Sequence, residues 1–144
     1  MLSTTSEHAL KAMVYLAQHA DEWPIPGRQV AAELAIPRKY LSSILRDLVR
    51  AGVLESSPGP GGGFKMVRSA DTVRLCEVLA PFEPGLSSEQ GCPFGNATCS
   101  DDDPCAGHER WRQVKDVFVR FLEETTVRDV AFKRARRGGS QRRR

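Results

Sequence analysis

The chain of 144 residues has no long apolar run, and its opening residues lack the pattern expected of a secretory leader. A membrane-spanning helix needs roughly 20 consecutive apolar residues, and no stretch of this sequence approaches that length. The opening MLSTTSEHAL has neither the basic region nor the apolar region of a signal peptide. We therefore expect a soluble, cytoplasmic protein, in a compartment where disulfides are rare.

The short motifs of common enzymes are also missing. There is no C-x-x-C redox motif and no nucleophile elbow, and the glycine-rich segment PGPGGG lacks the Gly-Lys-Ser/Thr ending of a phosphate-binding loop. His8 and His19 have no evident catalytic partner in the sequence. These absences count against catalysis, and we expect a protein that is not an enzyme.

Cysteine is scarce, yet three of the four cysteines fall in one loop, GCPFGNATCSDDDPCAGHERW. Cys92, Cys99 and Cys105 are followed there by His108. Thiolates and an imidazole favour zinc or an iron-sulfur cluster over calcium or magnesium. The spacing C-x6-C-x5-C-x2-H is wider than the knuckles of structural zinc sites and favours a bulkier cluster. The pattern predicts a metal site at Cys92, Cys99, Cys105 and His108.

Two other interpretations of these cysteines are weaker. Buried thiols would need a regular core, whereas the loop is rich in Gly, Pro, Asn, Ser and Asp. A disulfide would leave one of the three loop cysteines unpaired. Cys76 differs, because it lies among apolar neighbours at helical spacing in VRLCEVLAPF and is expected in the core.

The N-terminal third has the pattern of a helix-turn-helix. A capping box from Thr4 to Glu7 predicts a helix that runs to about Ala20. Its apolar stripe is expected at Leu10, Met13, Val14 and Ala17. A second helix is expected near Gly27–Leu34 and a third over Pro37–Ala51, with the short turn Ala35-Ile36-Pro37 between them.

The third helix and the segment after it resemble a DNA-reading unit. Leu41, Ile44, Leu45 and Leu48 are expected to face inward, and Gly52 to end the helix. Strands over Val53–Ser56 and Phe64–Val67 would then form a wing with the tip PGPGGG. Our candidate DNA-binding residues are Arg28, Arg38, Lys39, Tyr40, Ser42, Ser43, Arg46, Gly61, Gly62, Gly63 and Lys65. By itself the third helix fits an ordinary amphipathic helix with a solvated basic face almost equally well.

A late helix that begins near Glu109 has more apolar surface than one helix needs. Its stripe comprises Trp111, Val114, Val117, Phe118, Phe121, Leu122 and Thr125. We expect a second subunit to cover it in a homodimer, with packing on its own domain as the alternative.

The net charge of the chain is +3, but residues 131–144 carry seven basic side chains and no acid, so the net charge of the remaining body is −4. This tail either contacts nucleic acid or has no specific role.

With the helix-turn-helix, the wing Gly59–Phe64, the three cysteines and the run CAGHERW in that order, residues 1–131 resemble the Rrf2 family of bacterial transcription regulators. The resemblance implies a dimeric winged-helix protein whose affinity for a double-stranded DNA operator is switched by an iron-sulfur cluster. The signal would be redox state, nitric oxide or iron-sulfur status. A 2Fe-2S cluster is favoured over 4Fe-4S, and repression over activation.

Members of the family differ in the fourth ligand. The IscR-like pattern matches His108, whereas the NsrR-like pattern places a carboxylate of the partner subunit at Glu7. We favour His108, because Glu7 is expected in the capping box. The first cysteine gap has one residue more than in these relatives, and Pro58 replaces an arginine that often precedes the wing glycines. A cluster-free regulator that uses thiols or zinc, or a zinc-stabilised protein-interaction module, is the alternative.

We therefore predict a mainly α fold with a small β-wing. Residues 1–70 form the winged helix-turn-helix DNA-binding domain in this prediction. Residues 71–131 contain the cluster-binding loop and the dimerisation helix, and residues 132–144 form a basic, disordered tail.

Overall fold

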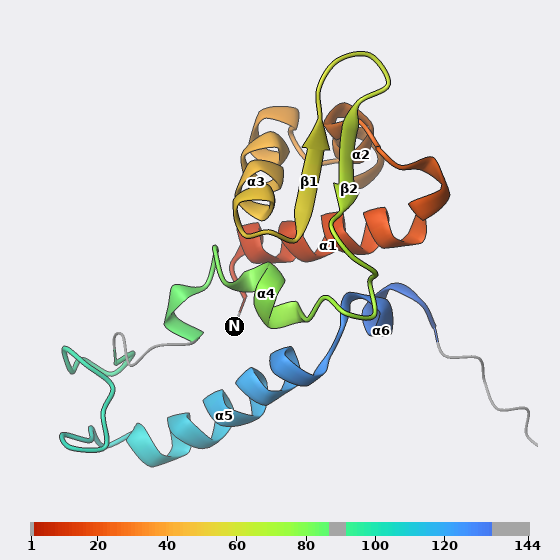
Figure 1. Ribbon diagram of the computed structural model, residues 1–144. Helices are drawn as coiled ribbons and strands as arrows, with labels where there is room; N and C mark the ends of the chain where they lie inside the picture. The colour runs from red at the N-terminus through yellow and green to blue at the C-terminus, as the bar shows by residue number, and fades with distance from the viewer. Residues whose placement is uncertain (1, 87–91, 134–144) are drawn as a thin grey trace, which may run out of the picture.

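The computed structural model describes residues 2–86 and 92–133, so part of the cysteine loop and the basic tail beyond Lys133 lie outside the described residues. The fold is mainly helical with one small antiparallel hairpin, as predicted (Figure 1). Its elements are α1 (Thr4–Gln18), η1 (Ala20–Glu22), α2 (Gly27–Leu34), α3 (Arg38–Arg50), β1 (Leu54–Ser57), β2 (Gly63–Met66), α4 (Leu75–Leu79), η2 (Pro84–Leu86), α5 (His108–Glu124) and α6 (Val127–Ala131). Within the described ranges, no helix has the length and apolar character to cross a membrane.

The helix-turn-helix is close to its prediction. Ala35 ends α2 in the left-handed conformation. Pro37 and Ala51 are the caps of α3 instead of its first and last residues, so α3 is one residue shorter at each end than expected. The four apolar residues predicted to face inward from α3 are buried, and Gly52 has the positive φ of a helix-terminating glycine. The stripe predicted on α1 faces the core: Met13 and Ala17 are buried, and Leu10 and Val14 are half-buried and pack against the core. The most buried apolar positions of α1 are Ala9, Ala12, Met13 and Leu16.

The start of α1 differs from the predicted capping box. The N-cap is Ser3, whose hydroxyl oxygen accepts from the Ser6 amide at 3.1 Å. The carboxylate that accepts from the backbone amide of the cap belongs to Glu83, at 2.8 Å, whereas Glu7 is exposed. The prediction placed the cap one residue too late and could not detect a partner that lies 80 positions away.

The wing is anchored to the segment before α2. Its register pairs Leu54 with Met66 and Ser57 with Gly63, one residue away from the predicted strand bounds. On the other side of β2, the Phe64 amide donates to the Ile25 carbonyl at 2.8 Å and the Ile25 amide donates back at 2.9 Å. Ile25 therefore fixes the start of β2, next to the glycine-rich tip.

The apolar core continues across residue 70. Val73, Leu75 and Val78 belong to the same buried cluster as the helices of the N-terminal half, together with Leu122 and Val127. The Val127 amide donates to the Val73 carbonyl at 2.8 Å, and the Gln18 side-chain amide donates to the Ala131 carbonyl at 2.7 Å. These bonds hold α6 against α1 and fix the C-terminal end of α5 on the body.

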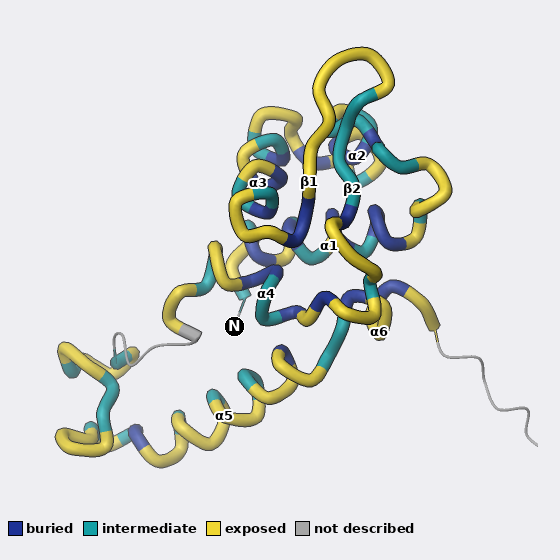
Figure 2. Tube along the Cα trace, in the orientation of Figure 1, coloured by how far each residue is buried: buried dark blue, intermediate teal, exposed yellow. Residues whose placement is uncertain are grey.

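The other end of α5 projects away from the body and leads back to the cysteine loop (Figure 1). Most of the helix is exposed or half-buried (Figure 2). Leu122 is buried, but Val114, Val117 and Phe121 are 49%, 67% and 50% exposed. Three of the seven residues of the predicted apolar stripe are therefore exposed on the chain's own domain.

Candidate metal centre and DNA-binding surface

The structure brings the four predicted metal ligands together in two pairs at the beginning of α5. The Sγ atoms of Cys92 and Cys105 are 3.4 Å apart, and the Cys99 Sγ lies 3.7 Å from Nδ1 of His108. All three thiols are half-buried, and none is in a disulfide. Within residues 2–86 and 92–133, no three donors are arranged around a single metal ion. The donor chemistry suits iron or zinc, and the paired arrangement suits a group with two metal atoms.

Loop geometry rather than regular structure positions these ligands. The His108 amide donates to the Cys105 carbonyl at 3.0 Å, so the last cysteine and the first residue of α5 share one turn. Gly95 has a φ of 113°, in the region that favours glycine, and lies in the one-residue-longer first gap. The Gly95 amide donates to the Cys92 carbonyl at 3.2 Å, which closes a turn after the first cysteine.

The thiols of the first pair differ in acidity. Backbone amides of Asn96 and Phe94 lower the pKa of Cys92, whereas the adjacent Cys92 sulfur and burial raise the pKa of Cys105. Cys92 therefore deprotonates before Cys105. Since the thiolate is the form that binds metal, Cys92 is the more readily available ligand of the pair.

His108 is almost fully buried, and a carboxylate holds its second ring nitrogen. Nε2 of His108 lies 2.9 Å from Oδ1 of Asp101, and Nη1 of Arg112 lies 2.8 Å from the same oxygen. The hydrogen bond with His108 and, to a smaller extent, the positive charge of Arg112 lower the pKa of Asp101. The sequence prediction missed Asp101, because the run Asp101-Asp102-Asp103 indicated only a polar loop.

Cys76 lies in α4, partly buried against the core, as predicted. Burial is the main cause of a raised pKa of its thiol. Glu7 is on the exposed side of the first turn of α1, so a role as a ligand to a second subunit does not conflict with the capping of this helix.

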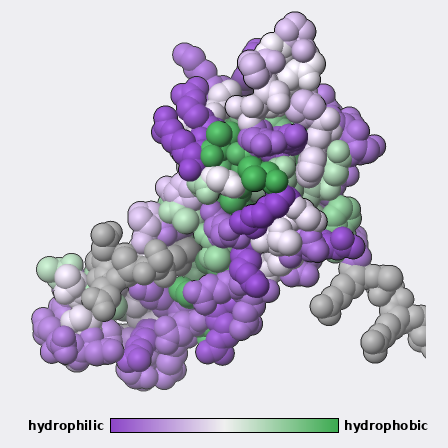
Figure 3. All heavy atoms as spheres, in the orientation of Figure 1, coloured by the Kyte–Doolittle hydropathy of each residue, from purple (hydrophilic) through white to green (hydrophobic). Residues whose placement is uncertain are grey.

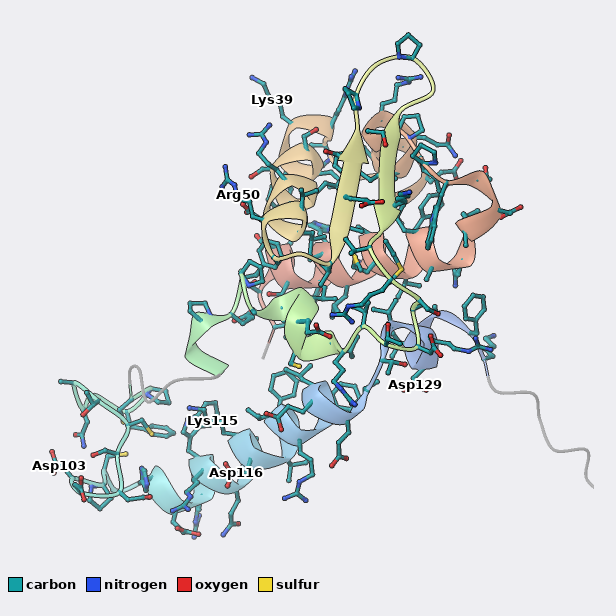
Figure 4. All side chains as sticks on the ribbon, viewed as in Figure 1. Lys39, Arg50, Asp103, Lys115, Asp116 and Asp129 are labelled. Atoms are coloured by element: carbon teal, nitrogen blue, oxygen red, sulfur yellow. The ribbon has the colours of Figure 1, made fainter. Side chains whose placement is uncertain are left out.

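The basic residues predicted on α3 form an exposed surface. Arg38, Lys39 and Arg46 are exposed, as is Arg28 on α2, and none of the four forms an ion pair with another described residue. Hydrophilic side chains cover the outer side of α3 (Figure 3), and Lys39 points away from the molecule (Figure 4). Lys39 and Asp103 lie at opposite ends of the molecule (Figure 4), so the predicted DNA-binding surface and the cysteine loop are well separated.

Other predicted DNA-binding residues have structural partners. The Tyr40 hydroxyl is hydrogen-bonded to Thr5, and its ring packs edge-on against His8, so Tyr40 faces α1. Lys65 pairs with Glu55 across the wing at 2.9 Å. Ser43 is exposed and Ser42 half-buried.

The wing glycines serve different purposes. Gly61 has a φ of 73° and open space around it, as expected of a tip that can approach a phosphate. A Cβ on Gly62 would lie 2.2 Å from the Ser57 carbonyl oxygen, and one on Gly63 would lie 2.3 Å from the Ile25 carbonyl. The shape of the hairpin itself therefore requires glycine at residues 62 and 63.

Comparison with known proteins agrees with this architecture. A family model described as Rrf2, iron-dependent transcriptional regulator, matches residues 2–133. An Aquifex aeolicus protein described as an HTH-type transcriptional regulator is 30% identical over 132 residues, 90% of each chain. The IscR regulator of Pectobacterium carotovorum is 27% identical over 129 residues, 90% of this chain and 77% of its own.

Two solved structures share the fold. CymR, the global cysteine regulator of B. subtilis, superimposes with a TM-score of 0.75 at 23% identity and covers 91% of this chain and 95% of its own. IscR of T. potens superimposes with a TM-score of 0.72 at 23% identity and covers 90% and 85%. These relatives are regulators and not enzymes. The chain thus belongs to the Rrf2 family of winged-helix transcriptional regulators.

Proposed function

We propose that this protein is a homodimeric repressor whose affinity for a double-stranded DNA operator depends on an iron-sulfur cluster. Cys92, Cys99, Cys105 and His108 would hold that group. In this proposal residues 1–70 read the operator, and residues 71–131 sense the signal and form the dimer. The signal is redox state, nitric oxide or iron-sulfur status.

The observation that carries the proposal is the arrangement of four donors in two pairs. Each iron of a 2Fe-2S cluster takes two protein ligands, and two ligands of one tetrahedral metal ion lie roughly 3.5 Å apart. The Cys92–Cys105 and Cys99–His108 distances of 3.4 and 3.7 Å match that spacing. A single zinc ion would need all four donors around one centre, which favours the cluster over zinc.

His108 is the favoured fourth ligand because its Nδ1 already faces a cysteine of the site. Glu7 has no capping role at the start of α1, so helix capping does not count against Glu7 as a ligand. It is therefore the direct contact of His108 with Cys99 that supports the choice. In the alternative 4Fe-4S site, Glu7 of a second subunit would be the fourth ligand in place of His108.

The path from the site to DNA begins at His108, which is both a ligand and the first residue of α5. A change in what the four donors hold would move the first turn of α5. The exposed apolar residues Val114, Val117 and Phe121 on the same helix provide the surface for a second subunit. Two subunits would then present two α3 helices, and a shift of α5 would change the separation of these helices on a palindromic operator.

The decisive experiment is to purify the protein without oxygen and to measure its visible absorption, iron and sulfide. Variants Cys105→Ala, His108→Ala and Glu7→Ala are compared with Cys76→Ala, the matched cysteine control outside the site. We expect a coloured protein with about two iron and two sulfide per chain, as a 2Fe-2S cluster requires. Colour should be lost in Cys105→Ala, altered in His108→Ala, and unchanged in Glu7→Ala and Cys76→Ala.

Two results would change the proposal. A colourless wild type with bound zinc or with bare thiols would refute the cluster and leave a regulator of the cluster-free kind. About four iron per chain, lost in Glu7→Ala and retained in His108→Ala, would replace the fourth ligand and the cluster type.

A further inference from the structure

The two ring nitrogens of His108 face different chemical groups. Nδ1 points to Cys99 at 3.7 Å, and Nε2 lies 2.9 Å from a carboxylate oxygen of Asp101. An ionised carboxylate only accepts hydrogen bonds, so Nε2 of a neutral His108 carries the hydrogen and Nδ1 keeps its lone pair. The lone pair is thus directed toward the thiols.

Asp101 is itself held in place from two sides. Arg112, one turn further along α5 than His108, donates to the same Oδ1 at 2.8 Å, and its Nε lies 3.8 Å from the carboxylate of Asp116. On the loop side, the Asp103 amide donates to the Ser100 hydroxyl oxygen at 3.3 Å, which closes a turn around Asp101. The carboxylate therefore bridges the loop and the first turns of α5.

We propose that Asp101 is a positioning residue that holds His108 in the Nε2–H tautomer, so that Nδ1 is the atom available to a metal. The ligand role of Nδ1 rests on the function proposed above. A carboxylate behind a ligating imidazole orients the ring and makes it a stronger donor, and loss of such a partner typically weakens metal binding by about 10–100-fold. Asp101 would thereby strengthen the one non-thiolate ligand and fix the loop to α5.

The first test uses the protein loaded with its cluster and compares Asp101→Ala with Asp102→Ala. Asp102 is an exposed neighbour, so the Asp102→Ala substitution removes the same charge from the same loop. Pulsed EPR of the reduced protein should detect one coordinated histidine nitrogen in the wild type and in Asp102→Ala. In Asp101→Ala we expect a changed nitrogen coupling, a higher reduction potential at fixed pH, and iron loss to a chelator that is about 10-fold faster.

The second test needs no cluster. Nitrogen NMR of the metal-free protein at about pH 8, above the ordinary titration range of imidazole, reports which ring nitrogen of His108 bears the hydrogen. We expect the Nε2–H tautomer in the wild type, a mixture of tautomers in Asp101→Ala, and recovery of the wild-type signal in Asp101→Glu.

The two tests separate failure of this inference from failure of the proposed function. An Nδ1–H tautomer in the wild type, or an Asp101→Ala protein that matches Asp102→Ala in nitrogen coupling, potential and iron loss, would overturn the role of Asp101. A wild type that binds no cluster would refute the proposed function and with it the ligand role of Nδ1. In that case the NMR result alone would decide whether Asp101 sets the tautomer of His108.

Discussion

The carboxylate of Glu83 accepts a hydrogen bond of 2.6 Å from the hydroxyl of Ser6. Glu83 follows α4 on the way to the cysteine loop, whereas Ser6 is in the first turn of α1. Neighbouring residues of α1 contact α3, because Thr5 bonds the Tyr40 hydroxyl and the His8 ring packs on Tyr40 with centroids 5.5 Å apart. Direct contacts therefore connect the segment before the loop with α3 inside one subunit.

Glu83→Gln should destabilise the fold, because the start of α1 would lose an ionised acceptor. We expect a loss of about 1–2 kcal/mol in the free energy of unfolding, measured by urea denaturation at neutral pH. Glu7 is exposed in the first turn of α1, so Glu7→Gln should change the free energy of unfolding by less than about 0.5 kcal/mol. A larger loss of stability in Glu7→Gln than in Glu83→Gln would support the capping box expected from the sequence instead.

The same contact predicts a dependence on pH. Partial burial alone would raise the pKa of Glu83, but hydrogen bonds from Ser6 and Ser3 outweigh it and lower the pKa. A lowered folded pKa means that the stabilisation is complete above the ordinary value of about 4.3 and is lost as the pH falls through the folded pKa. The stability difference between wild type and Glu83→Gln should therefore be constant near neutral pH and shrink below about pH 4. A difference that grows on acidification would contradict this assignment.

Local patterns predicted the helix-turn-helix well, because its signals lie within a few residues of each other. Gly27–Leu34 was predicted at its observed bounds, and Ala35 to Pro37 supply the turn through backbone geometry alone. Features that depend on distant contacts were missed or wrong. No local signal connects Glu83 with Ser3, and nothing in the sequence of α3 indicates that Tyr40 packs against His8.

The candidate site divides in the same way. The identity of the four donors followed from residue type and spacing, since metal chemistry depends on both. Their pairing did not, because it depends on how the loop closes around Gly95 and Cys105. Asp101 was hidden in an acidic run, where only the position of the side chain next to His108 distinguishes it from its neighbours.

Arg46→Ala should weaken operator binding while leaving the metal site intact. Arg46 is exposed on α3 and makes no ion pair with a described residue, so its charge is available to a phosphate or a base edge. We expect a loss of about 1–3 kcal/mol in binding free energy if it reads a base, and a salt slope reduced by about one if it contacts a phosphate. Fluorescence anisotropy at several salt concentrations measures both. Arg120→Ala, which removes the same charge from exposed α5, is the control and should bind as the wild type does.

Gly63→Ala should damage the wing more than Gly61→Ala. The added Cβ at residue 63 would lie 2.3 Å from the backbone of Ile25, and β2 cannot move away from Ile25 without breaking the Phe64–Ile25 bonds. We expect a loss of about 1–3 kcal/mol or more in stability together with weaker DNA binding. Gly61→Ala meets open space and should cost about 1 kcal/mol for its positive φ alone. Equal stabilities of the two variants would show that Ile25 does not anchor β2 in solution.

Val117→Glu should prevent dimer formation without unfolding the subunit. Val117 is 67% exposed on the apolar side of α5, so a carboxylate there remains in water in the monomer. In a dimer that buries this side of the helix, the same carboxylate would be desolvated without a partner, at a cost of several kcal/mol. Glu123→Gln also changes the charge of α5 by one unit, but at an exposed polar position, and should leave the dimer intact. Sedimentation equilibrium gives the mass of each variant, and circular dichroism confirms that each is folded. A Val117→Glu protein that sediments as a wild-type dimer would place the dimer contact elsewhere and remove α5 as the link between the metal site and the spacing of the recognition helices.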